Sequence, residues 1–157
     1  MERIVKKLTE LKKTISTMES CTGGGVANAI TNIEGSSEVL KFSAVTYSNE
    51  YKIKMGVDKS IIDTYTVYSM QVANEMSKKI SEFTNSDYGI GITGKLNRVD
   101  VNNPYGSDNI VYISIYEKEK DKFYNYTMEV TEKSRAENKT LIINLIANEL
   151  IKILNND

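Results

Sequence analysis

Histidine is absent from the 157 residues of the chain. This absence excludes Ser-His-Asp and Cys-His catalysis, because both use an imidazole as the general base. It also excludes most zinc sites, since the single cysteine, Cys21, cannot supply the remaining soft ligands. An enzyme with this composition has to take its base from lysine, tyrosine, aspartate or glutamate.

Cysteine, excess charge and long apolar runs are also scarce. A single cysteine forms no internal disulfide, and the N-terminus lacks the apolar core of a signal peptide, so we expect a cytoplasmic protein. A formal net charge of −1 gives no basic surface for nucleic acid or for an acidic membrane face. The longest apolar stretch is interrupted by Asn144, Asn148 and Glu149 and is not expected to span a bilayer. We therefore expect neither nucleic acid nor a membrane as a partner.

The composition that is present, with 40% hydrophobic and 26% charged residues, is typical of a soluble globular protein. The length suits one domain over residues 1–157. Apolar spacing predicts helices at 2–12, 26–32 and 133–154, and short helices or turns at 51–57 and 59–65. A further helix is capped by Ser69, with a buried side made of Val72, Ala73, Met76, Ile80 and Phe83. Strands are predicted at 14–18, 42–48, 88–93, 109–116 and 122–130.

Strands alternate with helices early in the chain, whereas two neighbouring strands follow each other late. This order predicts an α/β fold, a three-layer α/β/α sandwich with a mixed sheet. One long irregular loop, residues 95–108, contains the only proline, and such loops in compact domains tend to be functional or mobile. The last helix carries more apolar residues than one sheet-facing stripe needs, which predicts self-association as a homodimer or higher oligomer.

The stretch ESCTGGG, residues 19–25, places small reactive side chains at a predicted strand-to-helix turn. Glycines there let backbone N–H groups approach a ligand, and the helix N-terminus favours an anion. Ser20, Cys21 and Thr22 would lie at the C-terminal end of a strand, where α/β sheets bind ligands. A tight turn with Ser or Thr as caps explains the spacing equally well. Cys21 competes with Ser20 as nucleophile, although a lone cysteine in a packed turn is more often an inert small hydrophobe.

The stretch TYSNEYK, residues 46–52, ends another predicted strand. One interpretation makes Tyr47 and Lys52 proton-handling partners, since a site without histidine leaves these residue types and carboxylates as bases. The other is a strand end with a solvated lysine, which is the commoner fate of such a side chain.

The stretch GIGITGKL, residues 89–96, nearly matches the phosphate-binding loop G-x-x-x-x-G-K-[ST]. Leu96 stands where the motif has its metal-binding hydroxyl. The alternating GIGIT also reads as the strand itself, and a loop follows where the motif requires a helix. We therefore do not expect a nucleoside triphosphatase.

Three segments together resemble the family of the C-terminal domain of the competence/damage-inducible protein CinA. They are ESCTGGGVANAITNIEGSSEVL, VTYSNEYKIKMGV, and YSMQVANEM followed by SDYGIGITG. The resemblance runs over nearly the whole chain, and characterised members of the family are nicotinamide-nucleotide amidohydrolases. It implies hydrolysis of the carboxamide of nicotinamide mononucleotide, giving nicotinate mononucleotide and ammonia, with no metal and no cofactor.

The resemblance also implies the residues of the site. The family's catalytic serine falls on Ser20, and its tyrosine, lysine and arginine fall on Tyr47, Lys52 and Arg135. Ser20 would attack the amide carbon, and Tyr47, with or without Lys52, would accept and return the proton. Backbone N–H groups of residues 22–25 would bind phosphate or stabilise the oxyanion. The expected substrate-binding residues are Cys21, Thr22, Gly23, Gly24, Asn49, Thr93 and Gly94.

The loop after Gly94 departs from the family pattern. The family usually continues with a glycine- and proline-rich loop, whereas this chain reads KLNRVDVNNP. Lys95 and Arg98 add bulk, and their two cations offer a way to hold a phosphate. Two hypotheses follow. The intact catalytic positions favour the amidohydrolase, and the altered loop favours a catalytically weak relative that binds a nucleotide as a sensor or partner subunit.

Overall fold

A five-stranded mixed sheet forms the middle layer of the structure, a computed structural model that describes residues 1–132 and 134–156. Its strands lie in the order β2-β1-β3-β4-β5. They are β1 (Ile15–Glu19), β2 (Leu40–Val45), β3 (Tyr88–Gly94), β4 (Ile110–Glu117) and β5 (Lys122–Glu129). β1 pairs in parallel with β2 and β3, whereas β4 pairs antiparallel with β3 and β5. The late pair of strands is therefore a hairpin at one edge of the sheet.

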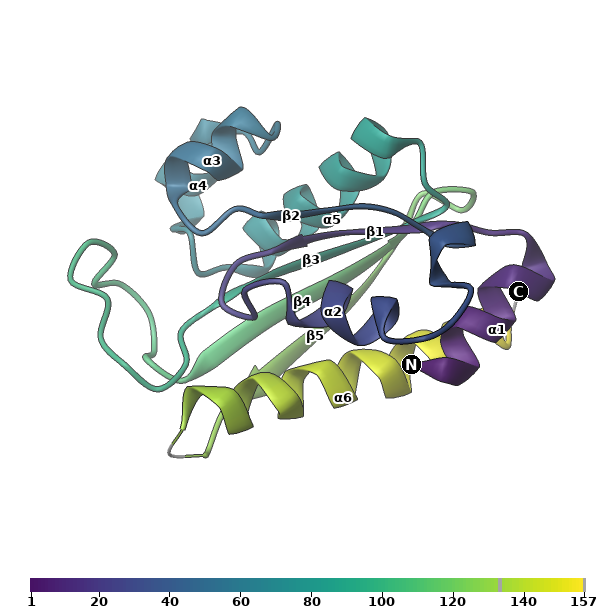
Figure 1. Cartoon of the computed structure of the whole chain (residues 1–157). Coiled ribbons are helices and arrows are strands. Elements are labelled where there is room, and N and C mark those ends of the chain that lie inside the picture. Colours follow the sequence, from purple (N-terminus) through teal and green to yellow (C-terminus); the bar gives the residue numbers. More distant parts are fainter. Residues whose placement is uncertain (133, 157) are drawn as a thin grey trace.

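Helices cover both faces of this sheet (Figure 1). They are α1 (Glu2–Leu11), α2 (Gly25–Thr31), α3 (Asn49–Lys54), α4 (Lys59–Tyr65), α5 (Met70–Thr84) and α6 (Arg135–Leu154), with a short 3-10 helix at Ser36–Glu38. α1, α2 and α6 lie on one face, and α3, α4 and α5 lie on the other. This arrangement confirms the predicted three-layer sandwich. No helix in the described part of the chain is long and apolar enough to cross a membrane.

Two apolar clusters, one on each face of the sheet, hold the central strands in place. The larger packs α1, α2 and α6 against the sheet, and the smaller packs α4 and α5 against Met18 of β1. β1 and β3 are buried along their whole length, as expected for strands covered on both faces. A Cβ on Gly91 would lie 2.2 Å from the carbonyl oxygen of Ala73, so glycine lets α5 pack directly on the β3 backbone. The middle of β3 is thereby packed closely against α5.

Two details of the sequence prediction are wrong. β2 ends at Val45, so Tyr47 lies beyond the strand that was expected to contain it. Phe83, expected on the buried side of α5, is 66% exposed, and its ring contacts Phe42 with 5.6 Å between the centroids. Phe83 lies in the last turn of α5, where the helix extends past the apolar cluster that buries Val72, Met76 and Ile80.

The last helix differs from its prediction at its start and on its surface. The predicted first residue, Lys133, lies outside the described residues, and α6 begins at Arg135 after Ser134, whose hydroxyl accepts a hydrogen bond from the N–H of Glu137. Most of its apolar side chains pack on the larger cluster, and none of the large ones is exposed along α6. Self-association stays a prediction, and α6 offers no exposed apolar face to support it.

Candidate active site

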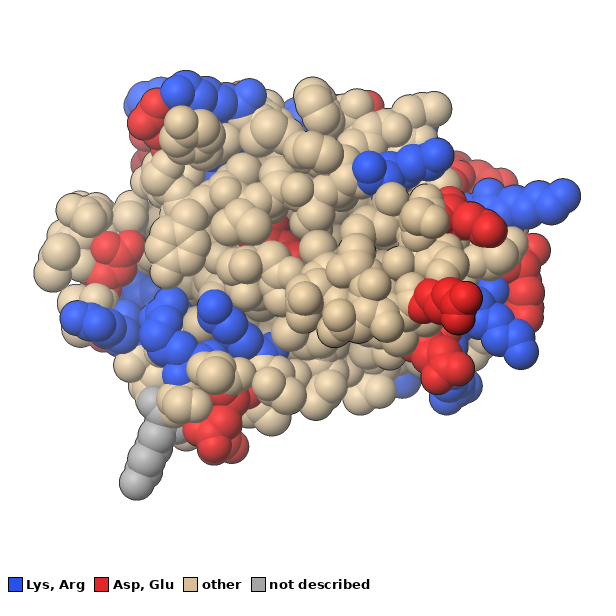
Figure 2. Space-filling model, in the orientation of Figure 1, with Lys and Arg blue, Asp and Glu red and all other residues tan. Residues whose placement is uncertain are grey.

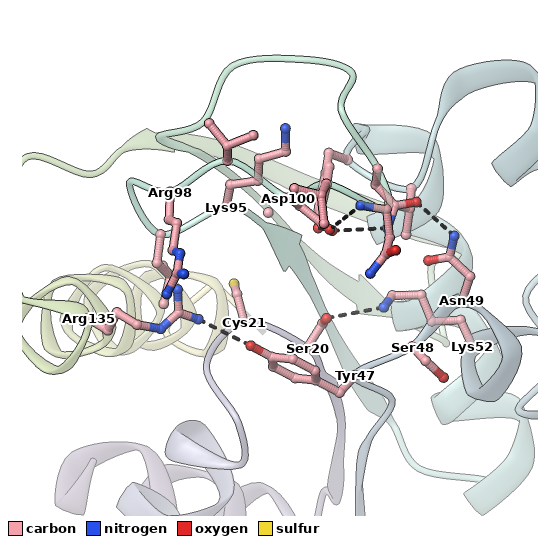
Figure 3. A pocket seen from close by; sticks show the side chains of 18 residues that line it. Ser20, Cys21, Tyr47, Ser48, Asn49, Lys52, Lys95, Arg98, Asp100 and Arg135 are labelled. Atoms are coloured by element: carbon pink, nitrogen blue, oxygen red, sulfur yellow. Dashed lines mark hydrogen bonds between the residues drawn. The ribbon is translucent and has the colours of Figure 1, made fainter.

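A cavity of about 760 Å³ opens where β1, β2 and β3 end (Figure 3). Its walls come from the turn after β1, the start of α3, the loop after β3 and the first residue of α6. Because α/β sheets bind ligands at the carboxyl ends of their parallel strands, this is the expected place for a site.

Glu19, the last residue of β1, fixes the turn that leads into α2. Its buried carboxylate accepts hydrogen bonds from the backbone N–H groups of Val26 and Ala27 at 3.1 and 2.9 Å. The hydroxyls of Thr22 and Thr17 add bonds of 2.6 and 3.2 Å. The carboxylate thus satisfies free N–H groups at the start of α2, where the helix dipole favours negative charge. Sequence reasoning missed Glu19, although a carboxylate just before a glycine-rich helix start is a signal for this role.

Some of the N–H groups of this turn donate hydrogen bonds inside the protein. The N–H of Gly23 donates to the carbonyl oxygen of Ser20 at 3.0 Å, and that of Gly25 donates to Thr22 at 3.2 Å. The first N–H groups of α2 are held by Glu19. Two of the four donors expected on residues 22–25, the N–H groups of Gly23 and Gly25, are therefore already used within the turn and are not available to a phosphate or an oxyanion.

Ser20 and Lys52 form the central contact of the cavity. Lys52 Nζ lies 3.1 Å from Ser20 Oγ and donates to the carbonyl oxygen of Thr46 at 2.7 Å. α3 brings it there: Ser48 caps this helix by accepting a hydrogen bond from the N–H of Tyr51, and Lys52 is the next residue. Lys52 is 1% exposed, so it is not a solvated lysine at a strand end.

Burial lowers the pKa of Lys52 to about 8, because its ammonium group loses hydration inside the protein. The negative charge of Asp100 acts in the opposite direction and limits this fall of the pKa. A lysine with a pKa of about 8 is partly neutral near neutral pH and accepts a proton there. Ser20 and Lys52 are therefore placed so that they can act as nucleophile and base without a histidine.

Cys21 lines the same cavity but is not activated. It is 4% exposed, and burial raises the pKa of its thiol to about 12. The thiolate is the nucleophilic form of cysteine, so Cys21 is a weak nucleophile at neutral pH. Of the two candidate nucleophiles, Ser20 is the one in contact with a base.

Tyr47 and Arg135 meet on the other side of Ser20 from Lys52 (Figure 3). Arg135 Nη2 donates a hydrogen bond to the Tyr47 hydroxyl at 3.2 Å, which links the segment after β2 to the start of α6. Because the phenol oxygen accepts this bond, its own proton is available to a ligand. Arg98 lines the same end of the cavity, and Figure 2 shows Lys and Arg side chains gathered on this part of the surface. This end therefore favours an anionic group.

Side-chain contacts hold the loop after β3. Lys95 Nζ pairs with Asp108 Oδ1 at 3.0 Å across the base of the loop, and Lys95 is 3% exposed. Asn49 Nδ2 donates to Asn103 Oδ1 at 3.0 Å and so ties the loop to α3. Lys95 is therefore engaged within the loop, whereas the Arg98 guanidinium has no partner among the described residues.

The cavity brings together most of the site residues expected from the sequence. Those that line it are Ser20, Cys21, Tyr47, Asn49, Lys52, Gly94 and Arg135. Four expected substrate-binding residues do not line it, namely Thr22, Gly23, Gly24 and Thr93. The Thr93 hydroxyl, for example, donates to the carbonyl oxygen of Val67 at 2.9 Å. Thr22 and Thr93 are buried, whereas Gly23 is exposed outside the lining of the cavity.

The family model of the CinA C-terminal domain matches residues 1–154. The chain belongs to this family. A CinA-like protein of Endomicrobium trichonymphae is 36% identical over 148 residues, which cover 92% of this chain and 34% of that protein. A CinA-like protein of Flavobacterium psychrophilum is 41% identical over 113 residues, which cover 70% of this chain and 26% of that protein. The chain thus spans about a third or less of the length of these relatives.

Solved structures share the architecture of this CinA-family chain. The competence/damage inducible protein CihA of Agrobacterium tumefaciens matches with a TM-score of 0.84 and 29% identity, over 98% of this chain and 92% of that one. A CinA superfamily protein of Klebsiella pneumoniae matches with a TM-score of 0.87, over 99% and 96% of the two chains. At 20% identity, the second match shows the fold alone.

Proposed function

We propose that the chain hydrolyses the carboxamide of nicotinamide mononucleotide, giving nicotinate mononucleotide and ammonia. The observation that carries this proposal is the 3.1 Å contact between Ser20 Oγ and the buried Lys52 Nζ. It supplies a nucleophile and a base in a chain without histidine. The same contact favours an enzyme over a relative that only binds a nucleotide, because binding alone requires no buried lysine of lowered pKa.

Acylation uses Lys52 as the base. Neutral Lys52 takes the proton of Ser20 as Oγ forms its bond with the amide carbon. The tetrahedral intermediate then collapses, the C–N bond breaks, and Lys52 returns the proton to the nitrogen, which leaves as ammonia. Tyr47, whose oxygen is held by Arg135, donates its hydroxyl hydrogen bond to the developing oxyanion.

In deacylation, water replaces Ser20 as the nucleophile and Ser20 becomes the leaving group. A water molecule attacks the ester carbon while Lys52 takes its proton, and Ser20 Oγ recovers that proton as the carboxylic acid leaves. The acid then ionises to nicotinate mononucleotide. Sequence reasoning left the choice between Tyr47 and Lys52 as the base open, and the contact with Ser20 favours Lys52.

The phosphate of the substrate fits the end of the cavity that carries Arg98 and Arg135. Both guanidinium groups offer a planar set of donors that suits phosphate oxygens. Lys95, which the sequence also proposed for this role, is paired with Asp108 instead.

An ammonia-release assay tests the proposal. Purified protein is incubated with nicotinamide mononucleotide, with nicotinamide riboside, which lacks the phosphate, and with free nicotinamide. We expect release from the mononucleotide, less from the riboside, and none above background from the Ser20→Ala variant. Equal release by the wild type and Ser20→Ala, or none from any amide, would contradict the proposed function.

A further inference from the structure

Asp100 is the one carboxylate among the described residues that line the cavity. Its Oδ2 accepts hydrogen bonds from the hydroxyl of Tyr68 and from Asn103 Nδ2, the latter at 3.0 Å. Its Oδ1 accepts one from the backbone N–H of Asn102 at 2.9 Å. All three donors are neutral, and Asp100 forms no ion pair with a described lysine or arginine. No described cation is therefore in ion-pair contact with this carboxylate, although its charge also acts on Lys52.

The carboxylate is charged at neutral pH. Hydrogen bonds from Tyr68 and Asn103 hold the pKa of Asp100 at about 2, because they stabilise the ionised form. An ionised side chain on a cavity wall, bound by neutral donors alone, still has favourable energy to gain from a cation.

The charges of the cavity are separated in space. Figure 3 shows Arg98 and Arg135 together on one side of Ser20, and Asp100 apart from them, above Ser20 in this view. A ligand that matches both ends carries an anionic group at the two arginines and a positive charge near the reacting serine. Nicotinamide mononucleotide has this pattern, since its phosphate is anionic and its pyridinium ring is cationic.

We propose that Asp100 is a specificity-determining residue that favours a substrate with a positively charged aromatic ring over a neutral ring of the same shape. This inference rests on the proposed amide hydrolysis at Ser20 and adds the charge class of the ring that carries the amide. Asp100 lies in the loop between β3 and β4, which borders the cavity.

A purely structural role for Asp100 makes a different prediction. Asp100 also orders the loop, because it links Tyr68 to Asn103, which in turn binds Asn49. Tyr68→Phe removes one of these hydrogen bonds and leaves the carboxylate charge in place. If Asp100 acts only through loop order, Tyr68→Phe and Asp100→Asn affect charged and neutral substrates alike.

The test compares two substrates that differ in ring charge. Nicotinamide mononucleotide and its reduced 1,4-dihydro form share the carboxamide, ribose and phosphate, but the reduced ring is neutral. The measured quantity is the preference, the ratio of kcat/KM for the oxidised over the reduced substrate, at pH 8 and low salt. We expect Asp100→Asn to lower the preference about tenfold, the equivalent of about 1.4 kcal/mol. Tyr68→Phe and the charge-conserving Asp100→Glu should each keep it within about threefold.

Three results would overturn the inference: an unchanged preference in Asp100→Asn, an equal loss of preference in Tyr68→Phe, or a complete loss in Asp100→Glu. A carboxylate that binds the ribose hydroxyls instead would lower both kcat/KM values together and leave the preference unchanged. The proposed function fails separately, if the wild type hydrolyses neither substrate. In that case calorimetric affinities of the two nucleotides for wild type and Asp100→Asn decide the charge preference.

Discussion

The turn after β1 and the loop after β3 border the same cavity, but different interactions hold them. In the turn, the Glu19 carboxylate accepts four hydrogen bonds from buried or partly buried donors of the chain's own backbone and hydroxyls. The loop relies on side-chain contacts such as Lys95 with Asp108 and Asn49 with Asn103, and its residues from Asn97 to Val99 are exposed. A change in the conformation of the turn would break buried hydrogen bonds, whereas the loop can change its conformation at a lower cost in free energy. We therefore call the turn after β1 the rigid wall of the cavity and the loop after β3 its adjustable wall.

This difference suggests that the turn carries the reaction and the loop carries substrate recognition. Ser20, the proposed nucleophile, follows directly after Glu19 in this turn and lies 3.1 Å from Lys52 Nζ. Arg98 and Asp100, which we propose bind the charged groups of the substrate, lie in the loop after β3. Changes in the turn should therefore affect kcat and stability, and changes in the loop should affect substrate preference and KM.

Removing the nucleophile should have the largest effect on activity. Ser20→Ala should lower kcat by about 10³-fold or more, since no other activated nucleophile faces the substrate. The unfolding free energy should change by less than about 1 kcal/mol, because the change deletes one small hydroxyl. Cys21→Ser is the matched control at the next position and should keep most activity. A Cys21 variant without turnover beside an active Ser20→Ala would reverse the assignment.

The second largest effect on activity is expected when the proposed base, Lys52, is replaced. Lys52→Met should lower kcat about 10²- to 10⁴-fold. Lys54→Met changes a lysine of the same helix that is exposed and should keep activity. The pH profile gives a second readout: wild-type kcat/KM should rise with pH to a plateau, with its midpoint near the pKa of Lys52, about 8. A profile that is flat between pH 6 and 10 would exclude Lys52 as the base.

Lys52 should also make stability depend on pH. Its pKa is about 8 in the folded chain and 10.5 in the reference state, so the unfolded chain binds more protons between these values. Wild-type stability therefore gains from Lys52 as pH rises through this window, and the burial penalty is complete below about pH 8. We expect the unfolding free energy of Lys52→Met, relative to wild type, to fall by about 2 kcal/mol from pH 7 to pH 10. Urea titrations at both pH values measure this difference, and Lys54→Met should show none.

The rigid wall itself is tested at Glu19. Glu19→Gln replaces an acceptor oxygen by an NH₂ group that faces the donors of Thr22, Val26 or Ala27. We expect a loss of about 1–3 kcal/mol in unfolding free energy, with a lower kcat because Ser20 is displaced. Glu38→Gln, at an exposed glutamate, should change neither quantity. Equal stability of the two variants would show that the turn is not held as the structure indicates.

The sequence predicted the helices and strands well, but not the side-chain contacts between segments that are far apart in the chain. The helical spacing of apolar residues and the capping residue Ser69 predicted α5 correctly. Both signals are local, since the Ser69 hydroxyl accepts its hydrogen bond from the N–H of Val72 in the first turn of the same helix. The absence of histidine directed attention to Lys52 before any geometry was known. The role of Asp100 depends on Tyr68, which is 32 positions away, and no local pattern encodes that pairing. Lys95 was assigned to phosphate for its charge, but the fold places Asp108 beside it.

The smallest effect is expected on the adjustable wall, at Arg98. Arg98→Ala removes a guanidinium that lines the cavity and has no partner among the described residues, so it should weaken phosphate binding without disturbing the loop. We expect KM for nicotinamide mononucleotide to rise about three- to tenfold, the range of a partly screened charge interaction, with kcat nearly unchanged. For nicotinamide riboside, which lacks the phosphate, the KM should stay within about twofold of wild type.

Lys95→Met is the matched control, because it removes a cation of the same loop that is already paired with Asp108. Its KM ratio between the two substrates should remain that of the wild type. If Lys95→Met changes this ratio more than Arg98→Ala does, the phosphate lies at the base of the loop and not beside Arg135.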